Sequence, residues 1–266
     1  MQREANSRAP VVLAIGGHDP SGGAGIQADI ETIHVLGGQP VTLITSLTAQ
    51  NTQRFERCIA VSPEQFREQA ELLLEDIDVQ AIKIGLVPTP GLADVIGSLL
   101  QERASVKVVC DPVLVSGTGT ATADTATVDA LRRLLPLVTV ATPNSEEARR
   151  LSGEGDLEVA AGRLLELGCK HVLVTGTHED TPTVANTLYS VTRRMTWTWE
   201  RLPHVYHGSG CTLASALATL LAHGLEVDSA ATLAQEYVWR TLKNGYPLGR
   251  GQYHPSRLRY TDAASR

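Results

Sequence analysis

Short apolar segments alternate with helical patterns along most of this chain. Six segments are typical of buried strands, and they cover residues 11–15, 41–47, 79–84, 106–110, 138–141 and 171–174. Five helical patterns lie between them, over residues 25–36, 63–74, 90–103, 123–134 and 157–167. This βαβα alternation predicts an α/β protein with one mostly parallel sheet and helices on both of its faces.

Residues 183–201 interrupt this alternation. Apolar and polar side chains alternate there, and Arg193 and Arg194 mark a candidate turn, so a small β-hairpin is predicted. Two further helices are expected over 212–222 and 227–243. Because no internal repeat or linker is visible, we expect a single domain over 1–266, with polar tails at 1–9 and about 250–266.

The overall charge and the cysteines exclude several classes of protein. The formal net charge is −6 and the basic residues are scattered, so no nucleic-acid partner is expected. The four cysteines form no CxxC pair, which argues against a metal–thiolate site. No apolar run has the length of a membrane span, and the first ten residues are polar. We therefore expect a cytoplasmic protein with reduced thiols and no membrane partner.

Glycine or small polar residues follow nearly every predicted strand. Parallel strands bring their carboxyl ends to one edge of a sheet, where ligands bind. The residues concerned should therefore meet in one cleft, and they comprise 16–19, 48–51, 85–86, 111–113, 142–144 and 175–178.

The segment from His207 to Thr212, HGSGCT, precedes the predicted helix over 212–222. A glycine-rich turn that leads into a helix presents free backbone N–H groups at the positive end of the helix dipole, which is an anion site. A thiolate at Cys211 would be stabilised by the same field. An inert buried thiol is the alternative for Cys211, and a core position is favoured over a base for His207.

A second glycine-rich turn, GGHDPSGGAG over residues 16–25, follows the first strand. Its spacing does not fit G-x-G-x-x-G, and no P-loop lysine follows, so a dinucleotide site is not expected. Close approach of the backbone to a small ligand is favoured over a plain tight turn. Asp29, one helical turn later, is interpreted either as a local hydrogen-bond acceptor or as an acceptor from a ligand hydroxyl.

Four polar residues at other strand ends carry two interpretations each. Gln50 offers a donor and an acceptor that match an aminopyrimidine edge, or it is an ordinary turn residue. Asp111 could bind Mg²⁺ or hold a loop. Asn144 and Glu147 share one face of a helical first turn, where they could organise Mg²⁺ and phosphate or form a capping box.

As a set, these motifs resemble the hydroxymethylpyrimidine and phosphomethylpyrimidine kinases of thiamine biosynthesis, in the ribokinase-like superfamily. The matching blocks are GGHDPSGGAGIQADIETI, ITSLTAQNT, AIKIGL, VVCDPVLV, LLPLVTVATPNSEEARRL and HGSGCTLASALA, over about residues 11–240. The resemblance implies a three-layer αβα sandwich and ATP-dependent phosphorylation of 4-amino-5-hydroxymethyl-2-methylpyrimidine. It also implies Mg²⁺, ATP as co-substrate and a homodimer.

The resemblance assigns roles to individual positions. An anion hole for the transferred phosphoryl group is implied at Gly208, Ser209, Gly210 and the Cys211 backbone, with the Cys211 side chain as catalytic base. The implied pyrimidine pocket comprises Gly17, Ala24, Asp29, Thr48, Gln50, Leu86 and Val113. Asn144 and Glu147 would organise Mg²⁺–ATP, Asp111 and Glu147 would hold the metal, and Thr175 and Gly176 would contact the nucleotide.

Two departures from the family pattern affect these expectations. Leu86 stands where the family has methionine, and the similar volume should preserve the pocket. Thr175 replaces a lysine that family members place near nucleotide phosphates. Two other functions stay open. One is a pyridoxal or pyridoxine kinase, whose substrates are also flat heteroaromatic rings with a hydroxymethyl group, and the other is a non-catalytic pyrimidine-binding relative, which the substituted Thr175 motivates.

Overall fold

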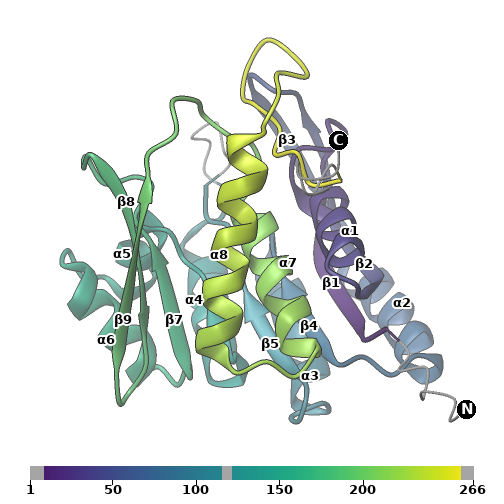
Figure 1. The fold of residues 1–266 in the computed structure, drawn as a ribbon. Coiled ribbons are helices and arrows are strands. Elements are labelled where there is room, and N and C mark those ends of the chain that lie inside the picture. The colour runs from purple at the N-terminus through teal and green to yellow at the C-terminus, as the bar shows by residue number, and fades with distance from the viewer. Residues whose placement is uncertain (1–8, 116–121, 259–266) are drawn as a thin grey trace, which may run out of the picture.

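The computed structural model describes residues 9–115 and 122–258 (Figure 1). Within these residues, one sheet of nine strands has the order β3-β2-β1-β4-β5-β6-β7-β8-β9. The run from β2 to β7 is parallel, whereas β3, β8 and β9 are antiparallel to their neighbours. The strands are β1 (Val11–His18), β2 (Gln39–Gln50), β3 (Phe55–Ala60), β4 (Ala81–Ile84), β5 (Lys107–Cys110), β6 (Val140–Ala141), β7 (His171–Thr175), β8 (Thr183–Tyr189) and β9 (Arg194–Glu200).

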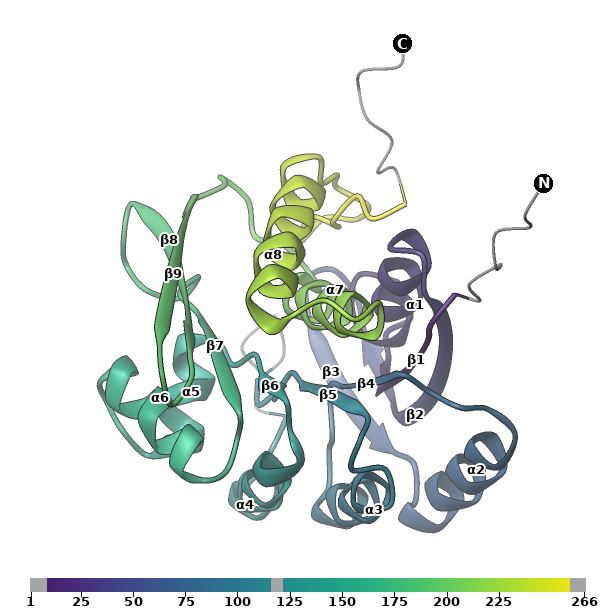
Figure 2. The same cartoon turned by 60° about the horizontal axis from the view of Figure 1, so that its bottom comes forward.

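Helices cover both faces of this sheet, as Figure 2 shows. One face carries α2 (Pro63–Asp76), α3 (Pro90–Gln101), α4 (Thr125–Leu134), α5 (Ser145–Ser152) and α6 (Leu157–Glu166). The other face carries α1 (Gly25–Val35), α7 (Ser209–Ala222) and α8 (Val227–Lys243). A short 3-10 helix, η1 (Leu135–Leu137), follows α4. The predicted αβα sandwich is confirmed.

Alternation along the strands builds one core on each face. In β1, Leu13 and Ile15 pack in the core beneath α2 and α3, whereas Val12 and Ala14 pack in the core beneath α1 and α7. All four side chains are at most 1% exposed. Because successive side chains of a strand point to opposite faces, the central strands are apolar throughout.

The list of predicted strands and helices lacks two elements, β3 and α5, and a third element, the hairpin, differs from its prediction in its position relative to the sheet. β3 is largely exposed, and Glu56 and Arg57 interrupt its apolar residues, so it lacks the continuous apolar run that would mark a buried strand. α5 is only eight residues long, and Ala148 and Leu151 are its buried apolar side chains. The predicted hairpin over 183–201 is confirmed, but it extends the sheet from β7 rather than forming a separate flap.

Residues 250–258, which were interpreted as part of a polar tail, are held by contacts with the rest of the protein. His254, Ser256 and Arg257 are buried, and the backbone of Tyr253 pairs with the segment that leads into α7. Apolar periodicity does not detect this segment because it packs through polar side chains and backbone hydrogen bonds. The remaining predicted tail residues, 1–8 and 259–266, lie outside the described residues.

Candidate active site

The anion loop, residues 207–211, leads directly into α7. Gly208 is the residue before the helix and has a φ of 83°, a conformation that favours glycine. A Cβ at Gly208 would overlap the carbonyl oxygen of Gly23. No side chain caps α7, so the N–H groups of Ser209, Gly210 and Cys211 stand at its positive end. The glycine-rich turn thus leads directly into a helix, as the sequence predicted.

The first glycine loop, residues 19–25, packs backbone to backbone against the anion loop. Asp19 organises it by accepting hydrogen bonds from Ser21 and from the Ala24 N–H at 2.8 Å. Its carboxylate also lies 2.8 Å from Nε2 of His207. Burial disfavours the Asp19 charge, but these hydrogen bonds and His207 outweigh it and lower the Asp19 pKa to about 2. His207 therefore occupies the structural position that was favoured for it.

A buried charge cluster lies beside the first turn of α7. The ammonium of Lys83 lies 2.8 and 2.9 Å from the two carboxylate oxygens of Asp29, and both side chains are fully buried. Asp29 also accepts a hydrogen bond of 2.7 Å from Ser215, one helical turn below Cys211. Asp29 is thus paired within the protein, with partners that are distant in the sequence rather than local.

Cys211 and Asp111 meet at the end of β5. A Cβ added to Gly210 would lie 3.5 Å from the Asp111 carboxylate oxygens, so the anion loop sits directly over this carboxylate. Burial raises the pKa of the Cys211 thiol to about 12, and the nearby Lys83 charge only partly opposes this effect. The expected stabilisation of a thiolate by the helix terminus is thus outweighed, because desolvation is the larger effect.

Asn144 and Glu147 form the capping box that was one of their two interpretations. The Asn144 side chain accepts from the Glu147 N–H at 2.9 Å, and Glu147 accepts from the Asn144 N–H at 2.9 Å. Glu147 also accepts from the Leu114 N–H at 3.3 Å. Burial and the proximity of Asp111 raise the Glu147 pKa well above its usual range. Two buried carboxylates repel one another, and a cation between them would relieve this repulsion. Mg²⁺ suits such a place, because it is usually bound by one or two carboxylates together with substrate phosphates.

Neither carboxylate belongs to a larger ligand group. Among the described residues, no set of three or more His, Cys, Asp or Glu side chains is placed to hold a metal. A metal at Asp111 and Glu147 would thus take most of its ligands from water and phosphate, which is the usual situation for Mg²⁺.

The residues predicted for the pyrimidine pocket fall on neighbouring strand ends. Gly17 lies against Leu86, since an added Cβ would lie 3.1 Å from a Leu86 methyl group. Thr48 donates to the His18 carbonyl at 2.8 Å and accepts from the Gln50 amide at 2.9 Å, which orients Gln50.

Ala24 and Val113 complete this predicted set. Ala24 immediately precedes α1, and its N–H is held by Asp19. Val113 follows Asp111, and its N–H donates to the Asp111 carbonyl.

Thr175 is the last residue of β7, and Gly176 follows it. Thr175 forms an isolated parallel bridge with Asn144, so the predicted nucleotide residues are neighbours. Gly176 donates its N–H to the Asn186 side chain, and a Cβ there would overlap the Ala185 carbonyl oxygen. Close packing against β8 therefore explains glycine at position 176.

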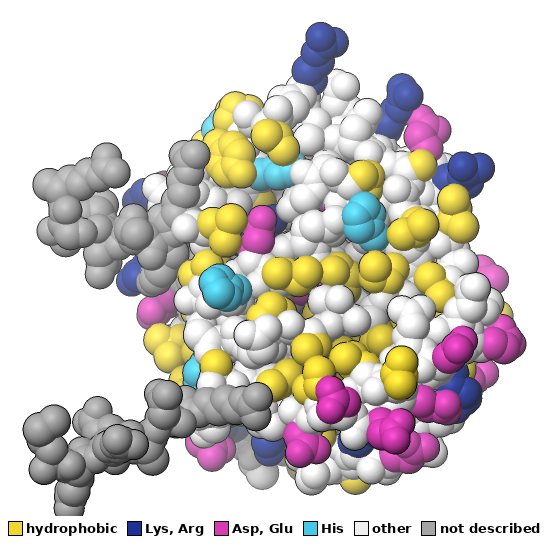
Figure 3. Space-filling model, turned by 90° about the vertical axis from the view of Figure 1, so that its right-hand side faces the viewer, with side chains coloured by type: hydrophobic (Ala, Val, Ile, Leu, Met, Phe, Trp, Pro, Cys, Tyr) yellow, Lys and Arg dark blue, Asp and Glu magenta, His cyan; other side chains and the backbone are white. Residues whose placement is uncertain are grey.

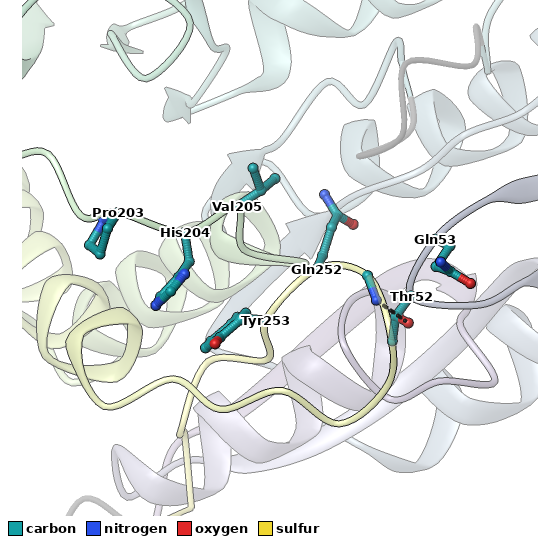
Figure 4. Close-up of a pocket in the computed structure, with 8 residues that line it drawn as sticks. Thr52, Gln53, Pro203, His204, Val205, Gln252 and Tyr253 are labelled. Carbon is teal, nitrogen blue, oxygen red and sulfur yellow. Dashed lines mark hydrogen bonds between the residues drawn. The ribbon is translucent and has the colours of Figure 1, made fainter.

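An open groove of about 580 Å³ lies next to the segment that leads into the anion loop (Figure 4). The β2–β3 turn, the segment before the anion loop and the C-terminal segment line it, through Thr52, Gln53, Pro203, His204, Val205, Gly251, Gln252 and Tyr253. The rings of His204 and Tyr253 stack at 3.9 Å, and Gly251 donates to Thr52. None of the predicted site residues lines this groove, although Gln50 is two residues from Thr52.

Comparison with known proteins places this geometry in a family. A family model described as phosphomethylpyrimidine kinase matches residues 19–256. A hydroxymethylpyrimidine/phosphomethylpyrimidine kinase of Streptomyces coelicolor is 38% identical over 91% of this chain and 92% of its own length. The chain belongs to the phosphomethylpyrimidine kinase family.

Solved structures agree with this membership of the phosphomethylpyrimidine kinase family. A phosphomethylpyrimidine kinase from Clostridium difficile has a TM-score of 0.76 and 32% identity over 86% of this chain and 97% of its own. A pyridoxal kinase from Bacillus subtilis, solved with ADP, has a TM-score of 0.86 and 31% identity over 95% of this chain and all of its own. The chain is thus a kinase with the ribokinase-like fold.

Two residues of this family member were assigned no role from its sequence. Lys83 and Arg257 are both charged and almost fully buried. Lys83 left a detectable signal, because it is the single charged residue of the apolar strand Ala81–Ile84. Arg257 left none, because it lies in a polar segment that was interpreted as a tail.

Proposed function

We propose that this enzyme transfers the γ-phosphoryl group of ATP to the hydroxymethyl group of 4-amino-5-hydroxymethyl-2-methylpyrimidine, with its monophosphate as a second acceptor. The observation that carries the proposal is the position of Cys211. It lies in the first turn of α7, within the anion loop and directly over Asp111. A loop that would bind the transferred phosphoryl group and a proton acceptor thus share one location.

The backbone of the anion loop supplies the charge stabilisation. Phosphoryl transfer requires alignment and neutralisation of charge more than covalent chemistry. The N–H groups of Ser209, Gly210 and Cys211 would donate to the oxygens of the transferred group, where their fixed orientation costs no reorganisation. The absence of a side chain at Gly208 and Gly210 allows this close approach.

The Cys211 side chain would receive the proton of the substrate hydroxyl. The Asp111 carboxylate accepts a hydrogen bond from the Cys211 thiol, and burial raises the Asp111 pKa to about 6. Burial favours the protonated thiol, so the thiol would first release its proton to solvent, and the nearby Lys83 charge would stabilise the thiolate that forms.

Asp111 and Glu147 would hold Mg²⁺, which supplies charge neutralisation on the phosphates when it is bound. Asn144 positions Glu147 through the capping box. Thr175 and Gly176, beside Asn144, would contact the nucleotide. Since Thr175 carries no charge where a lysine is usual, the phosphates would depend more on the anion loop and the metal.

Gln50 would recognise the pyrimidine by presenting one donor and one acceptor to the aminopyrimidine edge. Thr48 supports this role by accepting one amide hydrogen of Gln50. Pyridoxal is the second candidate substrate, because structural neighbours of this chain include pyridoxal kinases with TM-scores of 0.86 and 0.88. Both compounds are flat heteroaromatic rings with a hydroxymethyl group.

Mass spectrometry of the products would test the proposal. The protein is incubated with ATP, Mg²⁺ and the pyrimidine alcohol, and the phosphorylated pyrimidine and ADP are quantified. We expect the phosphate ester in amounts equal to ADP, and a larger kcat/KM for the pyrimidine than for pyridoxal in direct competition. Preference for pyridoxal would establish the second candidate, and no ATP consumption with either alcohol would support a binding protein.

We further propose that the enzyme acts as a cytoplasmic homodimer, as the family resemblance implies. Leu47 and Ile59 face each other across β2 and β3 and are 50% and 49% exposed. Figure 3 shows hydrophobic side chains gathered on this side of the molecule. Exposed apolar surface of this kind is typical of a protein contact.

No helix in the described parts of the chain has the length and apolar character required to cross a bilayer.

A further inference from the structure

The C-terminal strap, defined here as residues 246–258, crosses the two glycine loops and ends in a buried arginine. Its backbone pairs at Tyr253 with Val205 and His207, immediately before the anion loop. Its last anchored side chain, Arg257, is 2% exposed although it carries a full positive charge. The N–H donors of a buried guanidinium require hydrogen-bond acceptors, and the positions of those acceptors indicate what the arginine does.

Arg257 places its donors on three separate elements. Nε lies 2.8 Å from the Glu31 carboxylate of α1. Nη2 donates to the Gly22 carbonyl at 2.8 Å, and Nη1 donates to the Gly23 carbonyl at 3.1 Å. Nη1 also donates to the Thr212 hydroxyl at 3.3 Å. A single planar group therefore holds the first glycine loop and the first turn of α7 together.

The contact with Thr212 extends to the anion loop. The Thr212 hydroxyl, which accepts from Arg257, donates in turn to the Gly208 carbonyl at 2.8 Å. Gly208 is the residue whose backbone touches Gly23. The guanidinium thus sets the spacing between the loop predicted to line the pyrimidine pocket and the loop predicted to receive the phosphoryl group.

We propose that Arg257 is a positioning residue, which fixes the two glycine loops relative to each other and so aligns the substrate hydroxyl with the phosphoryl group. Its alignment role rests on the proposed function, whereas its role in ordering the loops does not. Arg257 touches neither reactant in this proposal. Docking of the C-terminal strap is consequently required for a competent site.

The test compares Arg257→Ala, Arg257→Lys and the control Arg250→Ala, an exposed arginine of the same strap. A 1 Å displacement of reacting groups costs about 100-fold in rate, so Arg257→Ala should lose about that factor in kcat. KM for ATP should change less than about threefold, since binding contacts are unaltered. Arg257→Lys should stay defective, because an ammonium cannot reach both loops at once. Arg250→Ala should behave as wild type.

Two results would overturn the proposal. Full activity of Arg257→Lys would show that charge alone matters, and equal loss in kcat and in the fraction of folded protein would show a purely structural role. Added guanidinium ion should partly restore kcat of Arg257→Ala without changing its melting temperature. Should Arg257→Ala fail to fold, Glu31→Gln replaces it in the test. This variant keeps the arginine but loosens its orientation, so it should lose kcat by a smaller factor.

Hydrogen exchange separates this proposal from the proposed function. Amides of residues 19–24 and 207–212 should exchange faster in Arg257→Ala than in wild type, with β8 and β9 unchanged. This outcome is independent of which alcohol is phosphorylated. Unchanged exchange in both loops would refute the positioning role even in an active enzyme, whereas an inactive wild type would refute only the proposed function.

Discussion

The ion pair between Lys83 and Asp29 yields a quantitative prediction about stability. Both side chains are fully buried, and two contacts of 2.8 and 2.9 Å join them. Substitution of Lys83 by methionine keeps the volume and removes the charge. The Asp29 carboxylate would then keep its hydrogen bond from Ser215 as a partner but lose the cation. Such an uncompensated buried charge is strongly unfavourable.

The expected loss for Lys83→Met is about 3–5 kcal/mol in the free energy of unfolding. At about 2–4 °C per kcal/mol for a domain of this size, the melting temperature should fall by roughly 6–20 °C. The double variant Lys83→Met/Asp29→Asn should recover most of this loss, because the amide stays able to accept from Ser215 while the buried charge is gone.

Urea unfolding and thermal scans of the two variants measure these quantities. Lys107→Met is the matched control, because Lys107 lies on the neighbouring strand β5 and is exposed, and it should change stability by less than about 0.5 kcal/mol. A loss below about 1 kcal/mol in Lys83→Met, or a double variant no more stable than the single one, would refute the reasoning about the buried pair.

Three further predictions concern the site. Cys211→Ala should lose about 100- to 10,000-fold in kcat and keep its affinity for the pyrimidine alcohol, and a wild-type rate would exclude Cys211 as the base. Gln50→Ala should raise KM for the pyrimidine by about tenfold and leave KM for ATP unchanged; equal losses for both would contradict its recognition role. The folded-state pKa of Asp19 lies below its ordinary value of 3.8, at about 2. Asp19 therefore contributes about 2 kcal/mol of stability above pH 4, which is lost as the pH falls towards 2. Urea unfolding across this range should show that loss in wild type, and its persistence in Asp19→Asn would exclude Asp19 as the source.

The elements that bury apolar surface were predictable. The strands β1, β4, β5 and β7 and the helices α1 and α8 lie within a few residues of their predicted ranges. Each has an apolar pattern with its own period, which the sequence carries locally. In β3 a charged pair interrupts the apolar residues, and α5 has only two buried apolar side chains, so neither element produces such a pattern.

The site was predicted in part, and the limits follow from the same cause. The strand-end residues, the anion loop and the capping box at Asn144 were detectable, because each has a short local signature. The buried partner of Asp29 was not, since Lys83 is 54 residues away in the sequence. The raised pKa of Cys211 was not detectable either. The effect of a helix terminus on a thiol can be inferred from neighbouring residues, whereas desolvation depends on residues that are distant in the sequence.

By itself, the sequence determined the parallel sheet, its helical layers and the edge of the sheet at which the glycine-rich loops gather, because hydrophobic periodicity and glycine-rich turns are properties of neighbouring residues. Only the tertiary structure decided which charges are paired and which groups are desolvated. Lys83 meets Asp29, and Arg257 meets the two glycine loops, through chain segments up to 235 residues apart. Electrostatic free energies depend on burial and distance in space, and neither quantity is encoded in local spacing.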